Sequence, residues 1–188
     1  MQIPRSILFV DGENLVKRYQ KMVDEGRQPL AEVVHEKDCF VWHRCLTEFA
    51  QFDFLRVCYY TSVAGDDDRV VQVKQRIAKT IFHCNPGGDH YQAQLVPFVF
   101  KKPAQTQKTR SVDINIVVDV MNYACSGAVD LIFLASGDGD YLPLITEVMK
   151  KGKQVNLAAF SSGLNPVLPY SVDEFFNLDE MFFAPKSS

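Results

Sequence analysis

Two short apolar runs, DLIFLA (130–135) and QVNLAAF (154–160), constrain the fold of this chain most strongly. Each run is continuous rather than alternating, as in strands that are covered on both faces, and the segment between them has the length of a helix. A strand, a helix and a second strand in this order form a right-handed crossover between parallel neighbours. The pattern predicts an α/β fold with a central, mostly parallel sheet and helices on both faces.

The rest of the chain continues this alternation. Apolar, β-branched and aromatic runs predict further strands at 6–10, 53–63 and around 95–100. Apolar side chains at helical spacing predict helices after residue 11 and at about 40–49, 69–81, 112–125 and 140–151. With 188 residues the chain is long enough for one substantial core. We expect one domain over residues 1–170, and an aromatic C-terminal extension over 171–188 that packs on the domain or on a partner.

Aspartates follow the predicted strands at the positions where ligands bind in such sheets. Asp11 ends the first strand, and Asp138 and Asp140 follow the strand at 130–135, where glycines permit a sharp turn. Asp113 lies in the first turn of a predicted helix, and helices of this architecture begin at the edge where strands end. We therefore expect the four carboxylates to converge on one edge of the sheet.

Carboxylates that lie close together raise one another's pKa unless a cation intervenes. Hard oxygen ligands without sulfur or imidazole select Mg²⁺ or Mn²⁺ over zinc, so the four aspartates predict a magnesium or manganese site. Asn14 could turn its amide to the same place, whereas Asp119 lies about 9 Å further along the helix, behind the ligands or in solvent.

Two alternatives remain for the Gly-Asp-rich segment. Asp138 or Asp140 alone could cap the following helix. A calcium loop is a poor alternative, because Leu142 and Met149 occupy positions five and twelve, which need oxygen ligands.

Basic side chains are concentrated in one region of a chain whose net charge is only −3. The stretch from Arg69 to Arg110 has Asp89 as its one acid and the following basic residues: Arg69, Lys74, Arg76, Lys79, Lys101, Lys102, Lys108 and Arg110. Its last part, KKPAQTQKTR (101–110), has no apolar periodicity and predicts an exposed loop. The region is either a solvated surface or a docking surface for a polyanion.

Cysteine usage and hydropathy indicate a cytoplasmic location. The five cysteines are odd in number and form no CxxC pair, which favours reduced thiols. The first residues lead directly into a strand without an apolar signal region. The sequence also has no run of 18 apolar residues, which a membrane-spanning helix would need.

Three blocks together resemble the NYN domain of the LabA/DUF88 group, relatives of the PIN-domain nucleases. They are FVDGENL near the start, RSVDINIVVDVMNYA in the middle and DLIFLASGDGDYLPLITEVMKKGKQVNLAAF. The resemblance implies a PIN-like fold and a metal-dependent ribonuclease. It implies metal-holding or catalytic roles for Asp11, Asp113, Asp138 and Asp140, with Asn14 and Ser136 as supporting polar groups. Arg110 stands where the family usually has a lysine, which changes the geometry of any phosphate contact.

Three functions follow from these observations. The first is a ribonuclease that hydrolyses RNA, single-stranded by expectation, whose backbone binds Lys101, Lys102, Lys108 and Arg110. The second is a nucleic-acid-binding regulatory adaptor with weak or no catalysis. A phosphatase of the haloacid dehalogenase type is disfavoured, because it needs an aspartate where this chain has Glu13. The aromatic residues at 175–183 are compatible with a homodimer contact or with covering the chain's own core.

Overall fold

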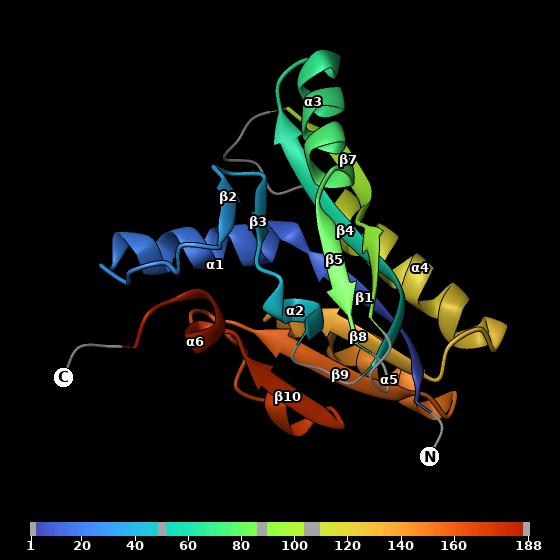
Figure 1. Cartoon of the computed structure of the whole chain (residues 1–188). Helices are drawn as coiled ribbons and strands as arrows, with labels where there is room; N and C mark the ends of the chain where they lie inside the picture. Colours follow the sequence, from blue (N-terminus) through green and yellow to red (C-terminus); the bar gives the residue numbers. More distant parts are fainter. Residues whose placement is uncertain (1–2, 49–51, 86–89, 104–109, 186–188) are drawn as a thin grey trace.

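The computed structural model describes residues 3–48, 52–85, 90–103 and 110–185. Six strands form a central sheet in the order β10-β9-β8-β1-β4-β7 (Figure 1). Their bounds are β1 Arg5–Asp11, β4 Asp53–Ala64, β7 Val96–Lys102, β8 Leu131–Ala135, β9 Gln154–Ala159 and β10 Glu174–Asn177. Each pair of neighbours in this sheet is parallel, which confirms the predicted α/β fold.

Helices cover both faces of the sheet (Figure 1). One face carries α1 (Gly12–Asp24), α2 (Cys45–Glu48), α3 (Asp67–Ala78) and α6 (Asp179–Phe182), with the hairpins β2–β3 (Val34–Glu36, Phe40–Trp42) and β5–β6 (Ile81–Cys84, Tyr91–Gln94). The other face carries α4 (Ser111–Ser126) and α5 (Leu142–Lys150). In β1, Leu8 and Val10 belong to the first core, and Ile7 and Phe9 belong to the second. Burial on both faces explains why the central strands read as continuous apolar runs.

Two sequence predictions about local structure are wrong. Phe40–Trp42, the start of a predicted helix, is strand β3, and the Tyr59 hydroxyl hydrogen-bonds to the backbone of Val41 there. The sequence predicts an exposed loop that begins at Lys101 and Lys102. In the structure these two residues are the last of strand β7, which stays paired with β4 beyond its apolar residues. Tertiary pairing overrides the local pattern in both places.

Residues 171–185 pack against the rest of the chain. Strand β10 pairs with β9 as an edge strand of the main sheet. Phe183 stacks on Tyr19 of α1 at a centroid distance of 5.2 Å, and Phe182 packs edge-on against Phe160 at 5.0 Å. These aromatic side chains cover the chain's own core, and the homodimer contact stays a prediction.

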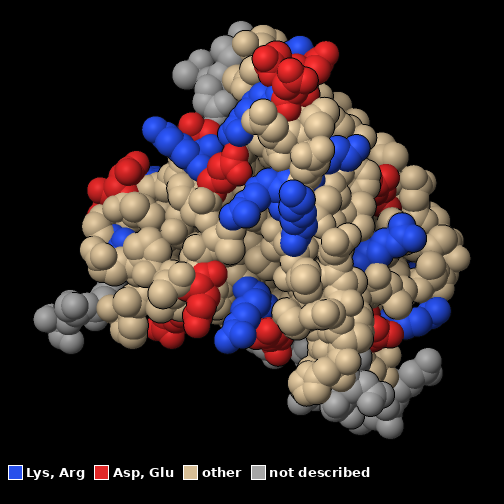
Figure 2. Space-filling model, turned by 45° about the horizontal axis from the view of Figure 1, so that its top comes forward, with Lys and Arg blue, Asp and Glu red and all other residues tan. Residues whose placement is uncertain are grey.

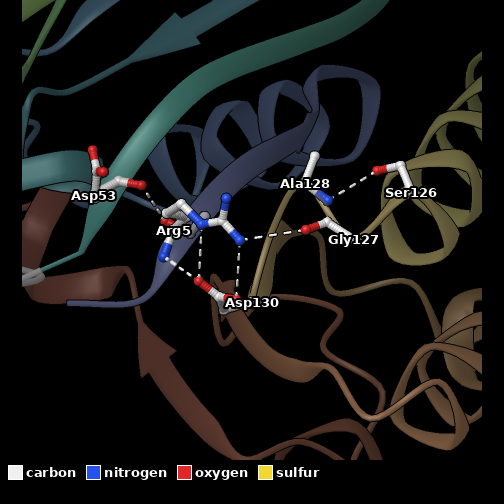
Figure 3. A network of polar contacts seen from close by, with 7 residues as sticks. Arg5, Asp53, Ser126, Gly127, Ala128 and Asp130 are labelled. Carbon is white, nitrogen blue, oxygen red and sulfur yellow. Dashed lines mark hydrogen bonds and ion pairs between the residues drawn. The ribbon is translucent and has the colours of Figure 1, made fainter. Parts of the chain in front are cut away.

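The strands begin at an edge where Arg5 joins β1 to the residues before β8 (Figure 3). The backbone N–H of Arg5 donates to Asp130 at 3.0 Å, and its guanidinium donates to Asp130 and to the carbonyl of Gly127. The in-register pairing then runs to Val10 and Ala135 at the other edge. The exits of β1 and β8 are therefore adjacent.

Among the described residues, no helix combines the length and the apolar character that crossing a bilayer requires.

Candidate metal centre

Asp11 is a buried carboxylate at the exit of the central strand β1, with 2% of its surface exposed. Its Oδ1 accepts the backbone N–H of Asn14 at 3.0 Å, and its Oδ2 accepts the hydroxyl of Ser136 at 2.9 Å. Burial raises the pKa of Asp11 to about 7, and the negative charges of Asp113 and Glu13 act in the same direction. The two hydrogen bonds lower the pKa but do not offset burial. Asp11 is therefore a group that a nearby cation would stabilise strongly.

The loop after β8 is fastened to the start of α1. The Oδ1 of Asn14 accepts the backbone N–H of Gly137 at 3.1 Å, and the Ser136 hydroxyl accepts the backbone N–H of Asp138 at 3.2 Å. Asp138 in turn caps the short 3-10 helix η2 (Gly139–Tyr141) by accepting the N–H of Asp140 at 3.1 Å. These contacts place Asn14 and Ser136 beside Asp11, and their supporting role stays a prediction.

Tyr141 connects two of the predicted ligands. Its hydroxyl lies 3.4 Å from Oδ2 of Asp11 and 3.3 Å from Oδ1 of Asp113. Burial raises the pKa of Tyr141, and the negative charges of Asp11 and Asp113 raise it further, so the phenol keeps its proton at neutral pH. The sequence did not predict this bridge; the available signal was a tyrosine directly after the Gly-Asp-rich turn.

A cavity of about 640 Å³ opens between α1 and the ends of the strands. Asp11, Asp113 and Asp138 all line it, although they come from three distant segments. The other lining residues are Glu13, Asn14, Val16, Lys17, Arg18, Gln20, Lys21, Asp24, Asp38 and Lys102. The structure thus brings three of the four predicted aspartates to one place.

Two predicted acidic residues are not among the described residues that line the cavity. Asp140 is exposed and is not among the described residues that line the cavity, so its metal-holding role stays a prediction. Asp119 accepts the hydroxyl of Tyr60 at 2.6 Å and is likewise absent from the described lining. Its contact supports the packing of α4 on β4 rather than the position of any of the three cavity aspartates.

Lys102 belongs to the cavity wall rather than to an exposed loop. Only 8% of its side chain is exposed, and its Nζ lies 3.6 Å from Oε1 of Glu13. The Ser62 hydroxyl donates to the same Glu13 oxygen. Sequence reasoning missed Glu13 as a cavity residue, and its position two residues after Asp11 was the available signal.

Some basic side chains of the stretch from 69 to 110 form ion pairs with acidic side chains in the folded chain. Arg69 pairs with Glu36 at 2.7 Å, and Lys101 pairs with Asp67 at 2.8 Å. Arg110 is exposed at the start of α4, and Lys108 lies outside the described residues. Figure 2, which brings the top of the view in Figure 1 forward, shows basic and acidic side chains side by side across that face. RNA binding by Lys101, Lys102, Lys108 and Arg110 stays a prediction.

The chain was compared with protein families and solved structures. The model of the NYN domain matches residues 5–179. The chain belongs to the NYN domain family. Membership places it in the PIN-like nuclease superfamily and confirms the resemblance to NYN domains, whereas the LabA/DUF88 subgroup stays a prediction.

One solved structure supports the same fold for this NYN domain. It is a protein of unknown function, VPA0982 from Vibrio parahaemolyticus RIMD 2210633, with a TM-score of 0.55 and 18% identity. The similarity covers 97% of this chain and 99% of that chain. At this identity the likeness shows the fold alone. A search of curated proteins finds no match.

The cavity of the NYN domain fits a hard dication by its donor chemistry. Asp11, Asp113 and Asp138 supply carboxylate oxygens, which Mg²⁺ and Mn²⁺ prefer. Within the described part of the chain, however, no group of three or more His, Cys, Asp or Glu side chains is arranged closely enough to hold a metal ion. The carboxylates surround the cavity without forming a ready coordination shell.

The burial of Asp11 leads to a prediction about the stability of the NYN domain without metal. Because the folded pKa of about 7 exceeds the ordinary value of 3.8, the wild type loses stability as the pH rises between these values. Asparagine has no charge to bury. At about pH 8 we therefore expect the free energy of unfolding of Asp11→Asn to exceed that of the wild type by about 1–3 kcal/mol. Urea unfolding in EDTA at several pH values would measure this. A gain that is equally large at about pH 4 would contradict the explanation.

Proposed function

We propose that this NYN domain is a Mg²⁺- or Mn²⁺-dependent ribonuclease that hydrolyses phosphodiester bonds of single-stranded RNA. The observation that carries the proposal is the convergence of Asp11, Asp113 and Asp138 on one cavity. Asp11 is buried there at the exit of β1, where it also caps α1 by accepting the backbone N–H of Asn14. The five cysteines are free in the structure, which fits the cytoplasmic location that we propose with it.

Asp11, Asp113 and Asp138 would hold the ion, and Asp140 would complete the site. A Mg²⁺ or Mn²⁺ ion bound there would supply Lewis acidity toward the scissile phosphate and an attacking water. The chain itself fixes the ligands: Ser136 and the backbone N–H of Asn14 orient Asp11 through both of its oxygens.

Two side chains have an additional role in this proposal. Asp113 stands in the first turn of α4 and would accept a proton from the attacking water. The Tyr141 hydroxyl, which reaches both Asp11 and Asp113, reduces their mutual repulsion before substrate binds.

A second candidate is a nucleic-acid-binding adaptor with weak or no catalysis. It is favoured by one observation: within the described residues, the carboxylates do not form a group that could hold a metal ion as they stand. An adaptor would use the same cavity to bind RNA without hydrolysing it.

Incubation of labelled single-stranded RNA with Mn²⁺, Mg²⁺ or EDTA tests the proposal. We expect the wild type to cleave RNA with either ion and to stop in EDTA, and we expect Asp138→Asn to cleave far more slowly. Cleavage that survives both chelation and the substitution would contradict the metal-carboxylate mechanism. Binding without cleavage under all conditions would favour the adaptor.

A further inference from the structure

The cavity extends from the carboxylates along the polar side of α1. Its lining includes Asn14, Lys17, Arg18 and Lys21, which recur at the three- and four-residue spacing of one helix face. The opposite side of the same helix carries the buried residues Leu15, Tyr19 and Met22. Three cationic side chains of this face therefore continue the wall on which Asp11 lies, and one of them, Lys21, also pairs with Glu25 at 3.6 Å. We call the part of the cavity lined by Lys17, Arg18 and Lys21 the α1 groove.

Arg18 carries an unused donor in this groove. Its Nε is buried and has no hydrogen-bond partner among the described residues. The guanidinium lies against the backbone of Gly163, where an added Cβ would come within 2.1 Å of Arg18 Cζ. A buried guanidinium N–H without an acceptor is costly, so Arg18 would gain by turning this donor toward an anionic ligand in the groove.

Acidic side chains limit the groove at both ends. Asp11, Glu13, Asp113 and Asp138 line the cavity where the strands finish, Asp24 is the last residue of α1, and Asp38 lies beside Gln20, within the section from Lys17 to Lys21. Asp38 is held in place by Gln20, which accepts its backbone N–H at 2.7 Å and donates to its Oδ1 at 2.9 Å. The cationic side chains would attract the phosphates of a nucleic acid to the section between these ends. The acidic side chain at the far end would repel them beyond it.

The length of the cationic section sets the size of the ligand. From Lys17 to Lys21 the helix rises about 6 Å, and one strand of a nucleic acid has a charge about every 3.4 Å along a helix axis. The α1 groove thus has room for about two nucleotides.

We propose that the α1 groove binds the one or two phosphates next to the scissile phosphate, so that single-stranded RNA runs along α1 away from the carboxylates. This inference rests on the proposed ribonuclease function and names the surface that holds its substrate. It places the main phosphate contacts on α1 rather than on residues 101–110. The RNA leaves the groove before it reaches Asp24.

The test compares two double variants that remove the same charge. Lys17→Ala with Lys21→Ala removes two cations from the groove. Lys150→Ala with Lys151→Ala removes two exposed cations at the end of α5, outside the described lining of the cavity. RNA affinity is measured in EDTA at several salt concentrations, cleavage is measured in Mn²⁺, and thermal unfolding checks that both variants are folded.

We expect the groove variant to lose about tenfold or more in affinity and to show a shallower salt dependence, because each phosphate contact contributes about 0.7 to the logarithmic slope for single strands. Its KM should rise by a larger factor than its kcat falls, since the carboxylates are intact. The α5 variant should bind RNA almost as the wild type does. Equal losses in the two variants, or no loss in the groove variant, would overturn the inference and leave the ribonuclease proposal intact. A wild type that neither binds nor cleaves RNA would overturn both.

Discussion

Replacing Asp11 by asparagine should lower kcat/KM for RNA cleavage about a thousandfold, which is roughly 4 kcal/mol of transition-state stabilisation. Asp11 is the most buried of the three cavity aspartates, and both of its oxygens are oriented by hydrogen bonds. Asparagine keeps the shape and an acceptor for the N–H of Asn14 but removes the charge that would attract a dication. Single-turnover cleavage of a labelled RNA at saturating Mn²⁺ measures the effect.

Asp130→Asn is the matched control for this loss. Asp130 directly precedes β8, at the edge of the sheet where β1 and β8 begin, and it binds Arg5 (Figure 3). The control removes one negative charge from the NYN domain without touching the cavity, so its cleavage should stay within about twofold of the wild type. If Asp11→Asn cleaved RNA as fast as the control, Asp11 would not be part of the catalytic centre.

Substitution of Gly12 by alanine should destabilise the domain by about 3 kcal/mol. Gly12 is buried directly after Asp11, where an added Cβ would lie 2.4 Å from Cε1 of Tyr59 and 2.6 Å from the carbonyl oxygen of Tyr60. The carbonyl belongs to β4, which pairs with β1, so it cannot move aside without disturbing the sheet. Chemical denaturation would report the loss as a lower midpoint with an unchanged slope.

Gly137→Ala provides the comparison, because it lies at the neighbouring strand exit. An added Cβ there would meet Leu164 Cα at 3.4 Å and Ala159 Cβ at 3.6 Å, which are ordinary contact distances. We expect a loss below about 1 kcal/mol for this variant. Similar losses at Gly12 and Gly137 would show that close backbone approach is not what selects glycine after Asp11.

The apolar runs predicted the parallel sheet because burial on both faces leaves a direct trace in the sequence. The same reasoning predicted that four aspartates would meet, since strand exits and helix starts share one edge, and Asp11, Asp113 and Asp138 line one cavity, whereas Asp140 is not among its described lining residues. Contacts between side chains left no comparable trace: the bridge of Tyr141 and the pairing of Lys102 with Glu13 depend on packing between distant segments. Charge counts along the chain were misleading for the same reason, because the acids that pair with Arg69 and Lys101 come from other elements.

The order of the strands also bears on the biosynthesis of this protein. Strand β1 leaves the ribosome first, yet its neighbours in the sheet are β4 and β8, and Ser136 is 125 residues away from Asp11. Folding must wait for these late segments, because a strand cannot pair with one that has not been translated. A nascent chain thus carries no assembled cluster of aspartates while most of it is still being made. In a ribonuclease of the kind proposed, the carboxylates of the candidate metal centre would thus come together only after the loop beyond β8 has been translated.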